Sequence, residues 1–184
     1  MADINKQINN LIKKIEKLPE VIDEYSKTNA FKEMAQLIVD GIVKRTRLGD
    51  SVKKFDGPSE KFAELAKSTI EQRKKYKKNL KKFGKKTTST TRSNLTATGE
   101  MLDSMKWKAK GSEITIYLDG DHEKTLNGKT PSKKIKNSDL AKYMENGDSS
   151  RNRPPRPFFN MSKTEVDLIR KQIASDIRKL IRRK

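Results

Sequence analysis

The stretch that most constrains the fold of this chain is RPPRPFFNMS, residues Arg153–Ser162. Proline fixes φ, removes a backbone donor and biases the residue before it toward extended geometry. We therefore predict a stiff, extended connection that could add a strand to a sheet. It should deliver Phe158 and Phe159 to an apolar surface, while Arg153 and Arg156 point elsewhere. Taken alone, the segment is also consistent with a simple proline-ordered lead into a terminal helix.

A helix-start signal follows this segment directly. Ser162 and Glu165 have the spacing of a capping box, in which each side chain hydrogen-bonds the other residue's backbone N–H. Apolar residues then recur at helical spacing: Val166, Ile169, Ile173, Ile177 and Leu180. The sequence therefore predicts a C-terminal helix with one apolar face.

Residues 1–45 are expected to form N-terminal helices. A first helical pattern runs from Asp3 to Leu18 and ends or kinks at Pro19. Asn29 is a candidate N-cap for a second helix. Its apolar stripe is unbroken: Phe31, Met34, Ala35, Ile38, Val39, Ile42 and Val43. We expect this helix to be the principal core helix, because every position of that face is apolar.

Residues 46–97 are expected to form a basic helical arm and loop. Gly57-Pro58 resembles a turn with proline at a helix's first position, and a weak apolar stripe then runs through Glu60–Phe83. Thirteen Lys and Arg lie between Lys53 and Lys86. The densest part of this basic patch consists of Lys74, Lys75, Lys77, Lys78, Lys81 and Lys82. A charge run of this kind is commonly just a solvated helix face.

Residues 98–184 are expected to contain a sheet, the Arg-Pro-Phe-Phe segment and the C-terminal helix. Apolar and polar residues alternate on both sides of Gly111-Ser112, which predicts a β-hairpin with one buried face. Asp119–Asn137 is polar and should be a flexible loop or a distorted hairpin. Ser138 is a candidate cap for a short helix that ends at Gly147.

Composition limits how much of the chain can enter a compact core. Only 32% of the 184 residues are hydrophobic and 36% are charged. That length suits one domain, residues 1–184, with a modest α+β body and solvated arms. Two basic loops, Lys85–Thr91 and Lys124–Lys136, should become ordered only against a partner. The partner could be an adjacent subunit, the other proteins of an assembly or DNA.

The charge balance favours a polyanionic partner. Lys and Arg number 43 against 24 Asp and Glu, for a net charge of +19. Nucleic acid, an acidic protein surface and an anionic membrane are the classes that such an excess suits. The chain has no cysteine, no apolar run long enough to span a bilayer and no apolar N-terminal signal stretch. We expect a protein made in the cytoplasm without disulfides or thiolate metal sites.

Catalytic chemistry is not expected. The single histidine, His122, lies in the sequence DGDHE, where four adjacent polar side chains of a turn point in different directions. No second ligand set, glycine-rich phosphate cradle or paired nucleophile appears. We therefore predict no catalytic residues, no cofactor and no metal.

Two further segments stand upstream of Arg-Pro-Phe-Phe. They read SNLTATGEMLDSM at Ser93–Met105 and DLAKYMENG at Asp139–Gly147. In this order, the three segments resemble the phage virion-morphogenesis or tail-completion proteins of the neck between capsid and tail. The resemblance covers roughly Arg45 to the C-terminus. That family usually reads Ala-Arg-Pro-Phe-Leu; here Pro155 stands in place of Ala and Phe159 in place of Leu, which preserves the apolar character.

The resemblance implies a small α+β domain, with a twisted antiparallel sheet packed by an N-terminal and a C-terminal helix. It also implies a structural virion protein that joins the portal or connector to the tail as a ring, commonly of six or twelve copies. We expect Phe158 and Phe159 to anchor the segment, and Arg153 and Arg156 to face a neighbouring subunit or an acidic ring surface.

The main alternative is a basic protein that binds nucleic acid without sequence specificity. The Lys53–Lys86 block offers phosphate contacts, but it lacks a base-reading motif. Contact with packaged DNA is compatible with both interpretations. A membrane-surface helix is disfavoured, because the apolar face of Glu60–Phe83 is interrupted by Thr69 and Arg73.

Overall fold

The structure is a computed structural model that describes residues 16–75, 95, 99–123 and 134–183. Its helices are α2 (Leu18–Ser26), α3 (Asn29–Arg47), α4 (Lys67–Lys75), α6 (Glu100–Asp103), α7 (Asn137–Asn146) and α8 (Lys163–Arg183). Its strands are β1 (Asp50–Ser51), β2 (Glu60–Lys61), β3 (Met105–Lys110), β4 (Glu113–Leu118), β5 (Asp121–His122) and β6 (Ile135–Lys136). The expected α+β class is confirmed. The helical pattern of Asp3–Leu18 and the basic loop at Lys85–Thr91 lie wholly or mostly outside the described residues.

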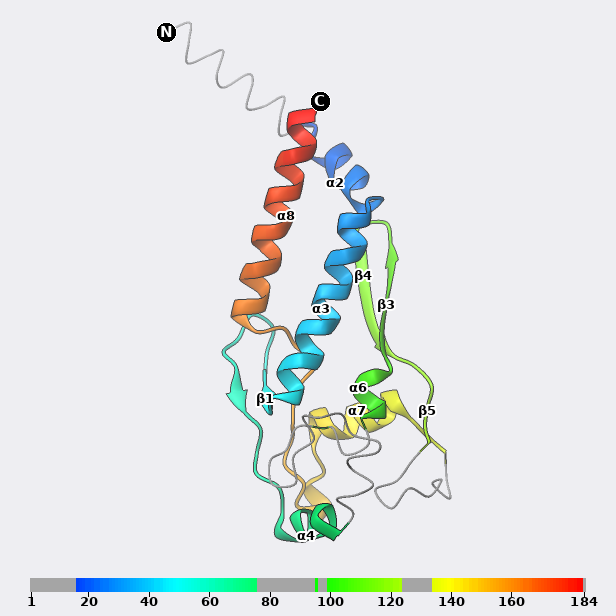
Figure 1. Ribbon diagram of the computed structural model, residues 1–184, viewed down its shortest axis with the longest axis vertical. Coiled ribbons are helices and arrows are strands. Elements are labelled where there is room, and N and C mark those ends of the chain that lie inside the picture. The colour runs from blue at the N-terminus through cyan, green and yellow to red at the C-terminus, as the bar shows by residue number, and fades with distance from the viewer. Residues whose placement is uncertain (1–15, 76–94, 96–98, 124–133, 184) are drawn as a thin grey trace, which may run out of the picture.

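Two long helices form the frame of an elongated molecule. Figure 1 shows α8 running beside α3, with α2 across the same end as the C-terminus and α4 at the opposite end. Most of the apolar stripe of α3 is buried as expected, and its Ile38 and Val43 are partly buried. Its N-cap is Thr28 rather than Asn29, because the extended Thr28 accepts the N–H of Phe31 at 3.3 Å through Oγ1.

The predicted β-hairpin is present. β3 and β4 pair antiparallel, with Met105 opposite Leu118 and Trp107 opposite Ile116, and Gly111 in the turn adopts φ 57°. This hairpin packs on α3 through β3. The described strands form three separate antiparallel pairs, β1–β2, β3–β4 and β5–β6, so no described strand has two neighbours.

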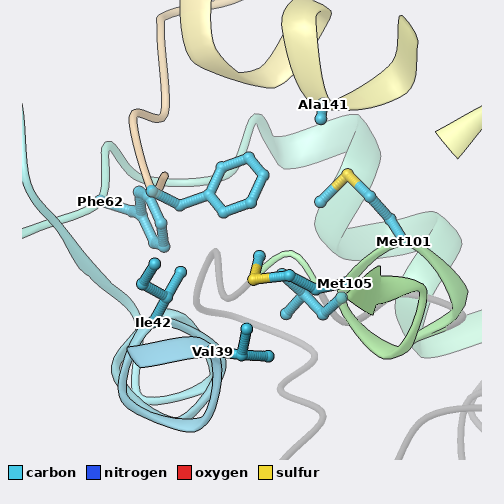
Figure 2. Packing of buried hydrophobic residues seen from close by; sticks show 8 residues of the cluster. Val39, Ile42, Phe62, Met101, Met105 and Ala141 are labelled. Carbon is cyan, nitrogen blue, oxygen red and sulfur yellow. The ribbon is translucent and has the colours of Figure 1, made fainter. Parts of the chain in front are cut away.

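Two apolar clusters hold these elements together. One lies among α3, the hairpin, α6, α7 and the Arg-Pro-Phe-Phe segment, and consists of Val39, Ile42, Phe62, Met101, Leu102, Met105, Ala141 and Phe158 (Figure 2). The other joins α2 and α3 to the apolar face of α8 around Tyr25, Phe31 and Met34. The first cluster therefore ties α3 to the hairpin, α6 and α7, and the second ties α3 and α2 to α8.

The expected helix over Glu60–Phe83 was wrong in its first part. Residues 60 and 61 are β2, which pairs with β1, and the helix begins only at Lys67. Pro58 accordingly precedes a strand rather than opening a helix. Phe62 enters the core from this extended chain, held by its N–H on Gly49 O at 2.9 Å. The backbone bonds to residues 49–51 outweigh a weak helical pattern.

The short helix before the Arg-Pro-Phe-Phe segment, α7, begins two residues earlier than expected, with Lys136 rather than Ser138 at the N-cap position. Ser138 lies inside its first turn, and no side chain caps it. The buried Asn137 holds this start instead, because its Nδ2 donates to Asp119 O at 3.0 Å. The predicted end at Gly147 is confirmed. The expected loop over Asp119–Asn137 contains the β5–β6 strand pair at its two ends. Residues 124–133 of this loop lie outside the described part of the chain.

Candidate assembly site around the Arg-Pro-Phe-Phe segment

The Arg-Pro-Phe-Phe segment is extended, as the prolines predict. Residues 153–159 form no helix and lie between α7 and the chain that follows β1. Pro157 O accepts the N–H of Val52 at 3.1 Å, and the N–H of Arg156 donates to Met144 O at 2.6 Å. The sheet of β3 and β4 contains only those two strands among the described residues, so the segment does not add a strand to it.

Phe158 and Phe159 anchor the segment in the larger cluster. Phe158 is fully buried and Phe159 is half-buried, and their rings meet edge to face at 5.9 Å between centroids. Both backbone N–H groups donate to Oε1 of Glu145, at 2.8 and 2.7 Å. One carboxylate on α7 therefore satisfies two donors that the extended chain would otherwise leave unpaired.

Arg45, at the C-terminal end of α3, binds the same segment from the other side. Its Nη2 donates to Phe158 O at 3.0 Å and to Asn160 O, and its Nε pairs with Glu165 Oε1 at 3.1 Å. The Arg45 side chain is only 8% exposed. The burial of Arg45 could be predicted from the sequence, because Arg45 follows Ile38 and Ile42 on the apolar face of the helix. The residues that Arg45 binds could not be predicted.

The capping box of α8 is confirmed in both directions. Oε2 of Glu165 accepts the N–H of Ser162 at 2.6 Å, and Ser162 Oγ accepts the N–H of Glu165 at 3.3 Å. The other carboxylate oxygen of Glu165 holds Arg45. Glu165 thus couples the start of α8 to the end of α3.

Arg153 and Arg156 point away from this apolar anchor. Arg153 is exposed and Arg156 is half-buried. Arg156 donates from Nη2 to Glu64 O at 3.2 Å and from Nη1 to Pro154 O at 3.4 Å. Within the described part of the chain, neither side chain forms an ion pair with a carboxylate.

A third guanidinium, that of Arg73 on α4, interacts electrostatically with Arg156. Arg73 is only 5% exposed, whereas its neighbours Lys74 and Lys75 are exposed. Burial lowers the pKa of Arg73, and the positive charge of Arg156 lowers it further. Burial also lowers the pKa of Arg156, with a second contribution from Arg153. Of the predicted basic patch, Lys77, Lys78, Lys81 and Lys82 lie outside the described residues.

His122 is part of a local ion-pair geometry. Its Nδ1 lies 3.1 Å from Glu100 Oε2, which places β5 beside α6, and the contact is an ion pair only when the imidazole is protonated. Among residues 16–75, 95, 99–123 and 134–183, no group of three or more His, Asp or Glu side chains is arranged to hold a metal. Likewise, no described helix is long and apolar enough to cross a membrane.

Comparison with known proteins adds no relative. No protein-family model, curated protein or solved structure matches this chain.

Proposed function

We propose that this chain is a structural phage virion protein of the neck, a ring-forming tail-completion subunit that joins the capsid portal or connector to the tail. One observation carries the proposal. The Arg-Pro-Phe-Phe segment is fastened to the core through Phe158, while Arg153 and Arg156 beside it have no carboxylate partner in the described chain. Arginine side chains held on an anchored segment are suited to bind carboxylates of a neighbouring protein in an assembly.

The exposed apolar side chains support assembly as a ring. Large hydrophobic residues exposed by more than half lie on or beside α3, between β1 and β2, on α7 and on the first part of α8: Leu37, Leu48, Phe55, Tyr143 and Leu168. An elongated subunit with such sides gains stability when neighbours cover them. We propose a closed ring of six or twelve copies, the numbers implied by the resemblance to neck proteins.

The proposal extends to the finer fold and to the basic arms. The twisted antiparallel sheet packed by terminal helices and the two long basic loops are features that we expect of the assembled state. The loops would become ordered on a neighbouring subunit, the connector, a tail component or packaged DNA. The protein would be made in the host cytoplasm and act in the virion, with no catalytic activity and no cofactor.

Deletion of the gene from its phage tests this function. We expect filled capsids and complete tails that remain separate in electron micrographs, because the joining ring is missing. Supplying the wild-type chain in trans should restore joined, infectious particles, with density for the protein at the neck. Joined and infectious particles from the deletion phage would overturn the proposal.

A second candidate is a free protein that binds nucleic acid without sequence specificity. Its support is the net charge of +19 and the basic last turn of α4, which contains Arg73, Lys74 and Lys75. This candidate predicts that the protein is absent from virions and binds DNA tightly as a monomer.

A further inference from the structure

We propose that the N-terminal seam of this chain pairs in parallel with the same seam of a second copy, as a two-stranded coiled coil. The seam consists of six apolar residues: Ile4, Ile8, Leu11, Ile15, Leu18 and Ile22. Leu18 and Ile22 lie on α2, and the other four residues lie outside the described part of the chain. The inference goes beyond the proposed function, because it assigns a contact between two copies wherever the protein acts.

The part of the seam on α2 is uncovered in the described chain. Leu18 is 36% exposed and Ile22 is 43% exposed, although Val21 and Tyr25 on the same helix are buried. Tyr25 belongs to the apolar cluster that joins α2 to α3 and α8, and α2 contacts both of these helices. The body of the molecule therefore buries one side of the apolar face of α2, and the side with Leu18 and Ile22 remains open for a partner.

The spacing of the seam is the heptad spacing of coiled coils. Its residues alternate at intervals of four and three over residues 4–22. The first heptad positions hold Ile8, Ile15 and Ile22, and the fourth positions hold Ile4, Leu11 and Leu18. Isoleucine at the first position with leucine at the fourth favours two parallel helices. The heptad pattern and the exposure of Leu18 and Ile22 thus point to the same face.

Pro19 does not end the helical backbone. It lies in the first turn of α2, where its missing N–H would have no partner within that helix. Before it, Glu16 is helical, and Lys17 has φ −82° and ψ −10° in the right-handed helical region. Because proline kinks a helix, we expect a change of direction at this point while the seam continues on the same side.

The charge of this segment suits a second copy of the chain. Residues 1–24 contain four Lys against five Asp and Glu, whereas the whole chain has a net charge of +19. Two copies therefore do not repel each other here, and an anionic partner finds no excess of positive charge. Lys14 is the only charged residue at the heptad positions that flank the seam, and in a parallel pair it faces Pro19 of the second copy. Like charges are thus kept apart across the seam.

The test is cysteine cross-linking of the full chain, which has no cysteine of its own. Core positions of a parallel coiled coil lie opposite their counterparts in the other helix, so Leu18→Cys should form a disulfide-linked dimer under mild oxidation. Glu20→Cys is the matched control, because Glu20 is exposed on the same helix but lies off the seam. It should remain unlinked on a non-reducing gel.

Two further variants test whether the seam itself holds the two copies together. Adding Ile22→Asp to Leu18→Cys should abolish the cross-link, because it places a charge in the apolar seam. Adding Asn10→Asp makes the same change of charge at a position off the seam, so the cross-link should persist. Leu18 and Ile22 are exposed in the single chain, so these variants should leave the fluorescence of Trp107 in the hairpin unchanged.

The absence of a cross-link from Leu18→Cys, or equal cross-linking of Glu20→Cys, would contradict the inference. A seam that folds against its own body or binds a different protein gives the first of these results. Cross-linking only in a mixture of Leu18→Cys with Ile8→Cys would show antiparallel helices and would also exclude the parallel pair. These outcomes do not depend on the neck proposal, which deletion of the gene tests separately.

Discussion

Phe158 is the side chain on which the Arg-Pro-Phe-Phe segment depends. It is fully buried in the larger apolar cluster and is flanked by backbone bonds to Glu145 and Arg45. Phe158→Ala should lower the free energy of unfolding by about 3–5 kcal/mol, because it leaves a cavity that the prolines prevent from closing. Urea denaturation followed by the fluorescence of the single tryptophan, Trp107, measures this loss.

Phe55→Ala is the control for that measurement. The Phe55 side chain is 61% exposed, so its removal should change the free energy of unfolding by less than about 0.5 kcal/mol. Equal losses for the two variants would mean that Phe158 is not an anchor.

The second prediction at the residue scale concerns the contribution of the Arg45–Glu165 ion pair to stability. Glu165→Ala leaves the nearly buried guanidinium of Arg45 without its counter-charge and also removes half of the capping box. We expect a loss of about 3 kcal/mol in the free energy of unfolding, at the low end for a buried pair because Glu165 retains 21% exposure. The double variant Arg45→Met/Glu165→Ala should lose less than the sum of the two single changes. Additive losses would exclude a coupled pair.

At the scale of elements, the turn after α7 sets the path of the Arg-Pro-Phe-Phe segment. Gly147 has φ +69°, and a Cβ there would lie 2.5 Å from Arg153 O and 2.7 Å from Pro155 N. Gly147→Ala should therefore lower the melting temperature strongly, since backbone rather than a movable side chain blocks the space. Thermal unfolding followed by circular dichroism measures the change.

Gly111 provides a matched control in the turn of the β3–β4 hairpin. Its φ is +57°, but a Cβ there would meet nothing within 4 Å. Gly111→Ala should lose only the backbone strain of a left-handed residue, about 1–2 kcal/mol. A Gly147→Ala variant as stable as Gly111→Ala would contradict the close approach of the chain at residues 153–155.

Elements with a clear period or cap could be predicted from the sequence. The alternation of Met105–Leu118 predicted the hairpin, and the Ser162–Glu165 pair predicted the start of α8. The path over residues 60–66 could not be predicted, because a two-residue strand has no period and its bonds lead to residues 49–51.

The candidate site was predictable only in part. The burial of Phe158 follows from its apolar character and its rigid proline context. The roles of Arg45, Glu145 and Arg73 do not follow from any local pattern. Each acts on residues more than ten positions away, through backbone atoms or long-range charge.

At the scale of the whole molecule, the net charge of +19 predicts the salt dependence and the sequence selectivity of DNA binding by the free protein. Binding should weaken steeply as salt is added and should not distinguish unrelated duplexes, because phosphate contacts alone carry it. Competition between two duplexes at two salt concentrations measures both properties. A preference of more than about tenfold, equivalent to roughly 1.4 kcal/mol, would indicate base or shape readout instead.

The central claim is that the chain works as a ring subunit, and its assembled mass tests this most directly. Size-exclusion chromatography with light scattering, combined with electron microscopy of the same fractions, gives both mass and symmetry. We predict closed rings at six or twelve times the subunit mass of 21.1 kDa. A particle that stays at the subunit mass at every concentration, is absent from virions and binds DNA tightly would contradict the account.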